Sequence, residues 1–71
     1  MTKKPGFLTW LRQQQKRDDR IGDLARDHIV DVQINGIRLR GAEAFIEHVT
    51  FVGCDAAVEA AIAAASEWED L

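Results

Sequence analysis

Few side chains in this sequence could serve as a nucleophile, a proton carrier or a metal ligand. His28 and His48 are the only histidines, and Cys54 is the only cysteine among the 71 residues. His28 falls on the apolar face of a predicted helix, which favours a packing role. Cys54 precedes the predicted start of another helix, a position that can lower the pKa of a thiol, but no base lies near it in the sequence. We interpret both residues as structural.

The sequence also lacks the motifs that position catalytic groups. Adjacent residues of a helix point in different directions, so Glu47 and His48 do not form a dyad. No Gly-rich phosphate loop, zinc-ligand spacing or nucleophile elbow is present. A chain of this length is also too small to enclose a typical ligand pocket of about 300 Å³ or more. We therefore predict a protein that is not an enzyme, with no catalytic residue, no metal, no cofactor and no small-molecule substrate.

Four aspartates, spaced four residues apart, form one stripe on a predicted helix: Asp19, Asp23, Asp27 and Asp31. Such a stripe could bind a divalent cation or a basic segment of a partner. A straight helix spreads its carboxylates apart, however, whereas calcium sites take their ligands from a curled loop. Arg20 and Arg26 lie three residues from Asp23 and can pair with it. We therefore expect a solvated, partly paired face rather than a metal site.

Charge is divided unevenly along the chain. Residues 1–40 hold all nine Lys and Arg together with five Asp, a net charge of +4, whereas residues 41–71 hold seven acidic residues and no basic one. We expect the two halves to fold against each other and to neutralise much of this charge internally, because a small chain offers few other arrangements. The alternatives are a basic partner, an acidic partner or head-to-tail self-association.

These charges define two candidate partner-binding surfaces. Carboxylates near the end of the last predicted helix oppose the helix dipole unless a basic group offsets them; the candidate protein-binding residues are Glu59, Glu67, Glu69 and Asp70. The candidate nucleic-acid-binding residues, which could contact phosphates, are Lys3, Lys4, Arg12, Lys16, Arg17 and Arg20. We predict a small regulatory or adaptor domain that binds another protein or a second copy of itself. The alternative is a nucleic-acid-binding protein that uses the basic N-terminal half.

Apolar periodicity predicts the elements that position these residues. Pro5 and Gly6 end a flexible lead-in over residues 1–6, and apolar residues then recur at helical spacing. Helices are expected at about 7–17, over 21–29 after an N-cap at Asp18 or Asp19, at about 42–50 and at about 55–69. The predicted fold class is mostly α, a single small domain over residues 1–71.

Residues 32–39 show a different pattern. Alternating apolar and polar residues flank Asn35-Gly36, the pair preferred in a two-residue type I′ turn. In that register the four apolar residues of the segment share one face. We expect a two-stranded hairpin at 32–39 that packs on the helices, because a hairpin alone is not stable in water.

Large and small residues predict how the helices pack. Trp10 and Trp68 each belong to an apolar stripe and are expected mainly in the core. A glycine within a helix costs about 1 kcal/mol relative to alanine, so Gly22 is expected to allow close approach of another element, such as the Trp10 ring. The predicted inner stripe of the last helix consists of Val58, Ala61, Ile62, Ala65 and Trp68.

The first two predicted helices carry a family resemblance. The chain resembles the YozE-like family in the string Phe7-Leu8-x-Trp10-Leu11-x-x-Gln14, followed by Arg17-Asp18-Asp19-x-Ile21-Gly22-Asp23-Leu24-Ala25-x-Asp27. The match covers residues 7–31 and suggests a bacterial or phage protein. It implies a SAM-like orthogonal bundle of about four helices and no particular activity. SAM-like folds serve both protein interaction and nucleic-acid binding, so the fold alone does not choose between the two functions.

Composition sets the remaining bounds. Apolar residues make up 46% and charged residues 30% of the chain, which is typical of a globular protein rather than a disordered one. No run approaches the roughly 20 apolar residues of a membrane span, and the basic start lacks the apolar stretch of a signal peptide. A single cysteine excludes an internal disulfide. We therefore expect a cytoplasmic protein that does not bind a membrane.

Overall fold

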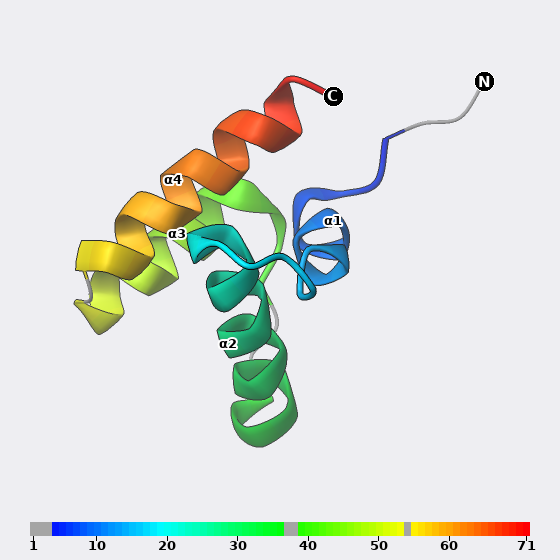
Figure 1. The fold of residues 1–71 in the computed structure, drawn as a ribbon. Helices are drawn as coiled ribbons and strands as arrows, with labels where there is room; N and C mark the ends of the chain where they lie inside the picture. The colour runs from blue at the N-terminus through cyan, green and yellow to red at the C-terminus, as the bar shows by residue number, and fades with distance from the viewer. Residues whose placement is uncertain (1–3, 37–38, 54) are drawn as a thin grey trace.

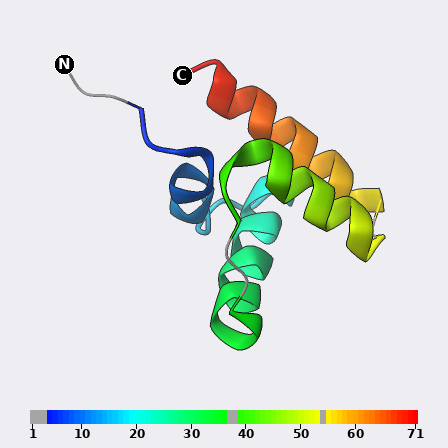
Figure 2. The ribbon, with the colours of Figure 1, turned by 180° about the vertical axis from the view of Figure 1, so that it is seen from behind.

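The part of the chain that the structure describes folds into four helices around one small core. The structure, a computed structural model, describes residues 4–36, 39–53 and 55–71. Its helices are α1 (Phe7–Gln13), α2 (Arg20–Asn35), α3 (Gly41–Val52) and α4 (Asp55–Glu69). Helices α3 and α4 lie side by side, and α2 projects away from them so that its C-terminal end stands apart (Figures 1 and 2).

Helix α1 is shorter than the predicted span of 7–17. It ends at Gln13, and the amides of Gln14 and Gln15 donate to carbonyls three residues back, which tightens the chain into a turn. The buried residues of α1 are Phe7, Leu8, Trp10 and Leu11. No apolar residue follows until Ile21, so a longer helix would bury nothing further and lacks the packing that stabilises short helices.

Helix α2 begins where the sequence predicts. The Asp19 side chain accepts a hydrogen bond from the Gly22 amide at 2.9 Å, as expected of an N-cap. Gly22 is buried, and a Cβ atom built on it would overlap the carbonyl oxygen of Arg17. The close approach predicted for Gly22 is therefore confirmed. Its partner is the backbone just before the helix and not the Trp10 ring.

The hairpin predicted at 32–39 is wrong in the part that the structure describes. Val32 to Asn35 form the last turn of α2, and Gly36 ends the helix in the left-handed region with φ 64°. Val32 is only half-buried and Ile34 is exposed, so these two alternating apolar residues do not share a buried face. The Asn-Gly pair suits a helix C-terminus as well as a turn. The predicted turn's Ile37 and Arg38 lie outside the described residues.

Helices α3 and α4 confirm their predicted positions. Most of the predicted inner stripe of α4 is also confirmed, because Ala61 and Ala65 are buried and Val58 and Trp68 pack against the core. The buried residues of α4 also include Ala60 and Ala64. Ile62, predicted to face inward, is 54% exposed. Alanine faces allow two helices to approach closely, and here the close approach to α2 and α3 outweighs burial of the larger isoleucine.

An aromatic cluster joins the two ends of the chain. The Phe7 ring lies 5.9 to 6.1 Å from the ring centroids of Trp10, Phe45 and Trp68. Trp10 is buried as predicted. Trp68 is only half-buried, and its indole N–H donates to the Pro5 carbonyl at 2.8 Å. None of the described helices is both long and apolar enough to cross a membrane.

Candidate functional site

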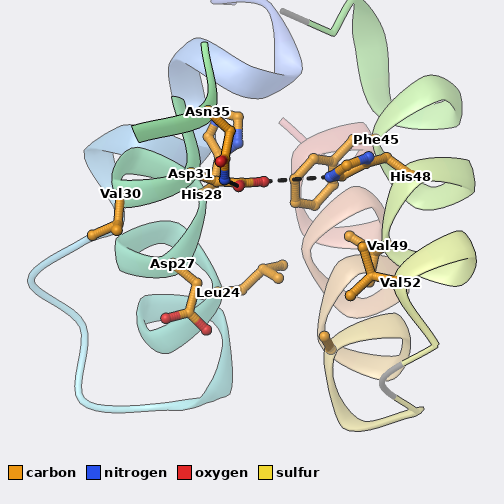
Figure 3. Close-up of a pocket in the computed structure, with 11 residues that line it drawn as sticks. Leu24, Asp27, His28, Val30, Asp31, Asn35, Phe45, His48, Val49 and Val52 are labelled. Carbon is orange, nitrogen blue, oxygen red and sulfur yellow. Dashed lines mark hydrogen bonds and ion pairs between the residues drawn. The ribbon is translucent and has the colours of Figure 1, made fainter. Parts of the chain in front are cut away.

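An open groove lies between α2 and α3. Every other pair of helices packs together, but α2 and α3 diverge over the described residues and leave a volume of about 610 Å³ (Figure 3). The apolar lining residues are Leu24, Val30, Phe45, Val49, Val52 and Ala57. The polar lining residues are Asp27, His28, Asp31, Asn35 and His48. The expectation that so short a chain forms no cavity of this size is corrected: the helices do not enclose a pocket, but their divergence opens a groove.

The apolar lining is buried deep in the groove and exposed at its edges. Phe45 and Val49 are buried, whereas Val30 is 50% and Val52 66% exposed. Ile34 on α2 and Phe51 on α3 are also exposed, although they do not line the groove. Exposed apolar side chains on both helices flank a groove that has an apolar floor, an arrangement common at sites of protein contact.

A polar bridge crosses the groove at one point. His48 Nε2 of α3 lies 3.3 Å from Asp31 Oδ2 of α2, and Asn35 donates to the other carboxylate oxygen of Asp31. The hydrogen bond from Asn35 and the contact with His48 lower the pKa of Asp31. Leu24, Val49 and Val52 lie together on one side of this bridge (Figure 3). Leu24 and Val49 are buried, and Val52 is exposed.

His28 is a buried packing residue, as predicted. It is 6% exposed, and its ring meets the Phe45 ring edge-on at a centroid distance of 5.3 Å. Burial, with a smaller contribution from the Arg12 charge, lowers the pKa of His28, so the imidazole is neutral at neutral pH. Its Nε2 atom is buried and has no hydrogen-bond partner among the described residues. The groove wall therefore holds one unsatisfied polar atom.

The acidic residues predicted to bind a partner lie away from the groove. Glu67 pairs with Arg17 at 2.9 Å, and Arg17 also pairs with Asp19 at 2.7 Å. The hydrogen bond from Arg17 lowers the pKa of Glu67. Glu59, Glu69 and Asp70 are exposed, and no basic side chain of the described residues bonds to them. Among the described residues, Lys and Arg of the N-terminal half therefore pair with Glu67 only in the acidic half.

The basic residues predicted to bind nucleic acid do not form an uninterrupted face. Arg17 is engaged by two carboxylates. The ammonium group of Lys4 lies 4.0 Å above the Trp68 ring. Arg12 and Arg40 line a second, smaller cavity of about 430 Å³ beside Trp68. Lys16 and Arg20 are exposed near the Asp19 end of α2, and Lys3 lies outside the described residues.

The four aspartates of the predicted stripe make different contacts. Asp19 caps the helix, Asp23 pairs with Arg26, and Asp31 joins the bridge to His48. Asp27 lines the groove, and no described Lys or Arg bonds to it. In the described part of the chain no three His, Cys, Asp or Glu side chains are placed to hold a metal ion. The interpretation of a partly paired face agrees with these contacts.

The groove itself was not predicted from the sequence. The sequence did indicate that a helix over this segment would expose apolar residues, because Ile29, Val30, Val32 and Ile34 cannot all face one side of a helix. The hairpin interpretation assigned Val32 and Ile34 to a sheet face and so removed the excess of apolar residues on α2. Once α2 continues to Asn35, Val30 and Ile34 are left exposed on it.

Comparison with known proteins adds no relative: no family model, no curated protein and no solved structure matches the chain. The resemblance to YozE-like proteins stays a prediction from residues 7–31. The functional argument therefore depends on the geometry of the groove.

Proposed function

We propose that this protein is a non-enzymatic regulatory or adaptor domain that acts by binding another protein through the α2–α3 groove. The observation that carries the proposal is the divergence of these two helices, which leaves an apolar groove with exposed valines at its edges. Burying a valine that is half exposed contributes about 1 kcal/mol. A few such residues, together with the groove floor, supply the apolar centre of a small interface.

The acidic residues of α4 lie away from the groove and form a second candidate surface for a basic partner. Glu59, Glu69 and Asp70 are exposed carboxylates without a described basic partner, and Glu69 and Asp70 stand at the helix end that disfavours negative charge. A partner with basic residues would offset them. Glu67 does not belong to this surface, because Arg17 of the same molecule already binds it.

We further propose a SAM-like arrangement, YozE-like ancestry and a cytoplasmic location. Support comes from the four short helices, from the residue string over 7–27 and from the single cysteine. Nucleic-acid binding is the less favoured function, because carboxylates engage Arg17 at the centre of the basic residues.

Two neighbouring substitutions test whether the groove binds a protein. Val52→Asp puts a charge into the groove, whereas Phe51→Asp puts the same charge at the adjacent position outside it. Both side chains are exposed, so both variants should fold. Affinity capture from the native host, after nuclease treatment, should recover the same proteins with the parent and with Phe51→Asp. Val52→Asp should lose them.

Equal recovery with all three proteins would show that the groove is not the docking surface. Recovery that disappears on nuclease treatment would instead assign the function to the basic residues of the N-terminal half. A second pair of variants then examines the acidic surface. Reversal of Glu69 and Asp70 to Lys should weaken capture most at low salt, where electrostatic steering is strongest.

A further inference from the structure

We propose that the occupant of the α2–α3 groove is a basic amphipathic helix of the partner, with apolar residues facing the groove and Lys or Arg beside them. This inference depends on the proposed protein-binding function and specifies the chemistry of the partner. The inference follows from the shape of the groove, from the charged residues around it and from the lack of a fitting segment in a second copy of this chain.

The walls of the groove favour a helix over an extended strand. Both walls are helices, whose backbone N–H and C=O groups are bonded within the helix, so they offer no edge to which a strand could add. A helix satisfies its own backbone and contributes only side chains. In the described residues, α2 and α3 are also the one pair of helices whose backbones do not approach each other; they meet only through single side chains, such as His28 on Phe45 and Asp31 on His48. A third helix laid between them restores ridge-into-groove packing.

The polar bridge sets where the occupant lies. Asp31 and His48 close the space between α2 and α3 at one level, and Leu24, Val49 and Val52 lie together on one side of it (Figure 3). The occupant's apolar side chains are therefore expected against Leu24, Val49 and Val52.

The charge around the groove selects a basic occupant. Asp27 lines the α2 side, exposed and without a described basic partner. Asp31 also lines this side, and the α3 side carries no Lys or Arg, because residues 41–71 contain none. An occupant that carries Lys or Arg is therefore attracted by Asp27, whereas an acidic occupant meets like charge there.

A second copy of the chain does not meet these requirements. Its most basic helical segment is α1 with its flanks, and the apolar face of α1 is already buried in its own core. Its exposed apolar residues on α2, Val30 and Ile34, have the acidic Asp27 and Asp31 as neighbours on the same helix. A partner of different sequence is therefore inferred.

A displayed peptide library tests the inference on the full chain. The peptides are about 16 residues long, roughly four helical turns, with apolar residues at helical i, i+3, i+4 and i+7 positions and all amino acids at the others. Selection on the parent protein should enrich Lys and Arg over Asp and Glu by about fivefold relative to the input. The recovered peptides should bind Phe51→Asp and fail to bind Val52→Asp.

A matched pair of charge variants then locates the attraction. Asp27→Asn and Asp23→Asn change the net charge equally, but only Asp27 lines the groove. A recovered basic peptide, measured by fluorescence anisotropy, should bind Asp27→Asn about three- to tenfold more weakly than the parent, and the difference should shrink in high salt. Asp23→Asn should bind like the parent.

The outcomes separate this inference from the proposed function. Recovered peptides that are acidic or uncharged, yet lose binding with Val52→Asp, would overturn the basic partner and leave groove binding intact. Peptides that bind Val52→Asp and Phe51→Asp equally, or no enrichment at all, would overturn both. A dimer seen by analytical ultracentrifugation and abolished by Val52→Asp would identify a second copy as the occupant and refute the inference.

Discussion

Gly22 has no side chain, and this allows the backbone that precedes α2 to pass close to the helix. The backbone of Arg17 passes so close to this position that a Cβ atom would overlap its carbonyl oxygen. The same stretch holds Asp19, whose side chain caps the helix through the Gly22 amide. The turn into α2 therefore depends on both residues, and the sequence predicted both from their types and positions.

We predict that Gly22→Ala destabilises the protein. Alanine is the better helix former by about 1 kcal/mol, but the overlap with rigid backbone should reverse this gain and cost about 1–3 kcal/mol. Urea unfolding followed by circular dichroism measures the change. Gln33→Ala, at an exposed position of the same helix, should change stability by less than about 0.5 kcal/mol. A stabilised Gly22→Ala variant would contradict the close contact.

His28 should make stability depend on pH. Burial, followed by the charge of Arg12, lowers its pKa in the folded state, whereas the nearby Asp31 acts in the opposite direction. Below the ordinary histidine pKa of about 6.5, the unfolded chain takes up the proton more readily than the folded one. The stabilisation is present above that pH and is lost as the pH falls through it.

We therefore predict that His28→Leu raises the free energy of unfolding by about 1 kcal/mol, because it removes the buried nitrogen without a partner. It should also flatten the loss of stability between about pH 7 and pH 5. Urea unfolding at a series of pH values measures both effects. His48→Gln should keep the steep dependence, and a variant at His28 with the parent's pH profile would refute the assignment.

At the scale of the elements, helix ends marked by capping residues were predicted better than the length and the packing face of each helix. The N-cap at Asp19 and the C-cap at Gly53 were predicted correctly, and α4 begins at Asp55, the residue predicted as its N-cap. The early end of α1 reflects the polar residues 14–20, which a longer helix could not bury, and the extension of α2 ends at Gly36 in the left-handed region. The Asn35-Gly36 pair suits a helix C-terminus as well as a hairpin turn, so the spacing of apolar residues alone led to a longer α1 and to a hairpin.

The exposure of Ile62 on α4 has a related origin. By periodicity, either Ile62 or the pair Ala60 and Ala64 can lie beside the inward-facing Ala61 and Ala65, and hydrophobicity favours the first. The structure takes the second because it lets α4 lie close to α2 and α3 at once. The groove was missed for a related reason: no sequence pattern shows that α2 and α3 diverge.

Two leucine substitutions test the packing face of α4. Ala64 is fully buried, so Ala64→Leu should cost about 1–3 kcal/mol or more through overpacking. Ala56→Leu, at an exposed position of the same helix, should change stability by less than about 0.5 kcal/mol. Thermal unfolding by circular dichroism compares them. If Ala64→Leu melts like the parent, α4 does not present the alanine face to the core.

At the scale of the whole molecule, the chain ends are held together by groups from both halves. Trp68 packs on Phe7 and donates to the Pro5 carbonyl, while Glu67 pairs with Arg17. The pair with Arg17 is largely solvent-exposed and contributes little stability. The indole is therefore expected to supply most of the stabilisation at this end of the bundle.

We predict that Trp68→Ala lowers the free energy of unfolding by about 2–4 kcal/mol, less than a fully buried tryptophan would cost, because the ring is half-buried. Trp68→Phe should cost about 1 kcal/mol for the lost hydrogen bond to Pro5. Phe51→Ala serves as the control, since Phe51 is 89% exposed and should be neutral. A parent-like melting curve for Trp68→Ala, measured by circular dichroism, would show that the ends are not held by this contact.

The uneven distribution of charge also determines how the molecule can be divided. Trypsin cleaves after Lys and Arg, so it can cut the chain after the exposed Arg40 but nowhere in α3 or α4. In the intact molecule, residues 41–71 form α3 and α4, which together pack on α1 and α2. They also carry a net charge opposite to that of residues 1–40. Two separately made peptides divided at this point should therefore reassemble into a 1:1 complex on size-exclusion chromatography, and elution as two separate species would contradict this. A protein made of such halves can be isotope-labelled in one half only, which would let each wall of the groove be observed alone.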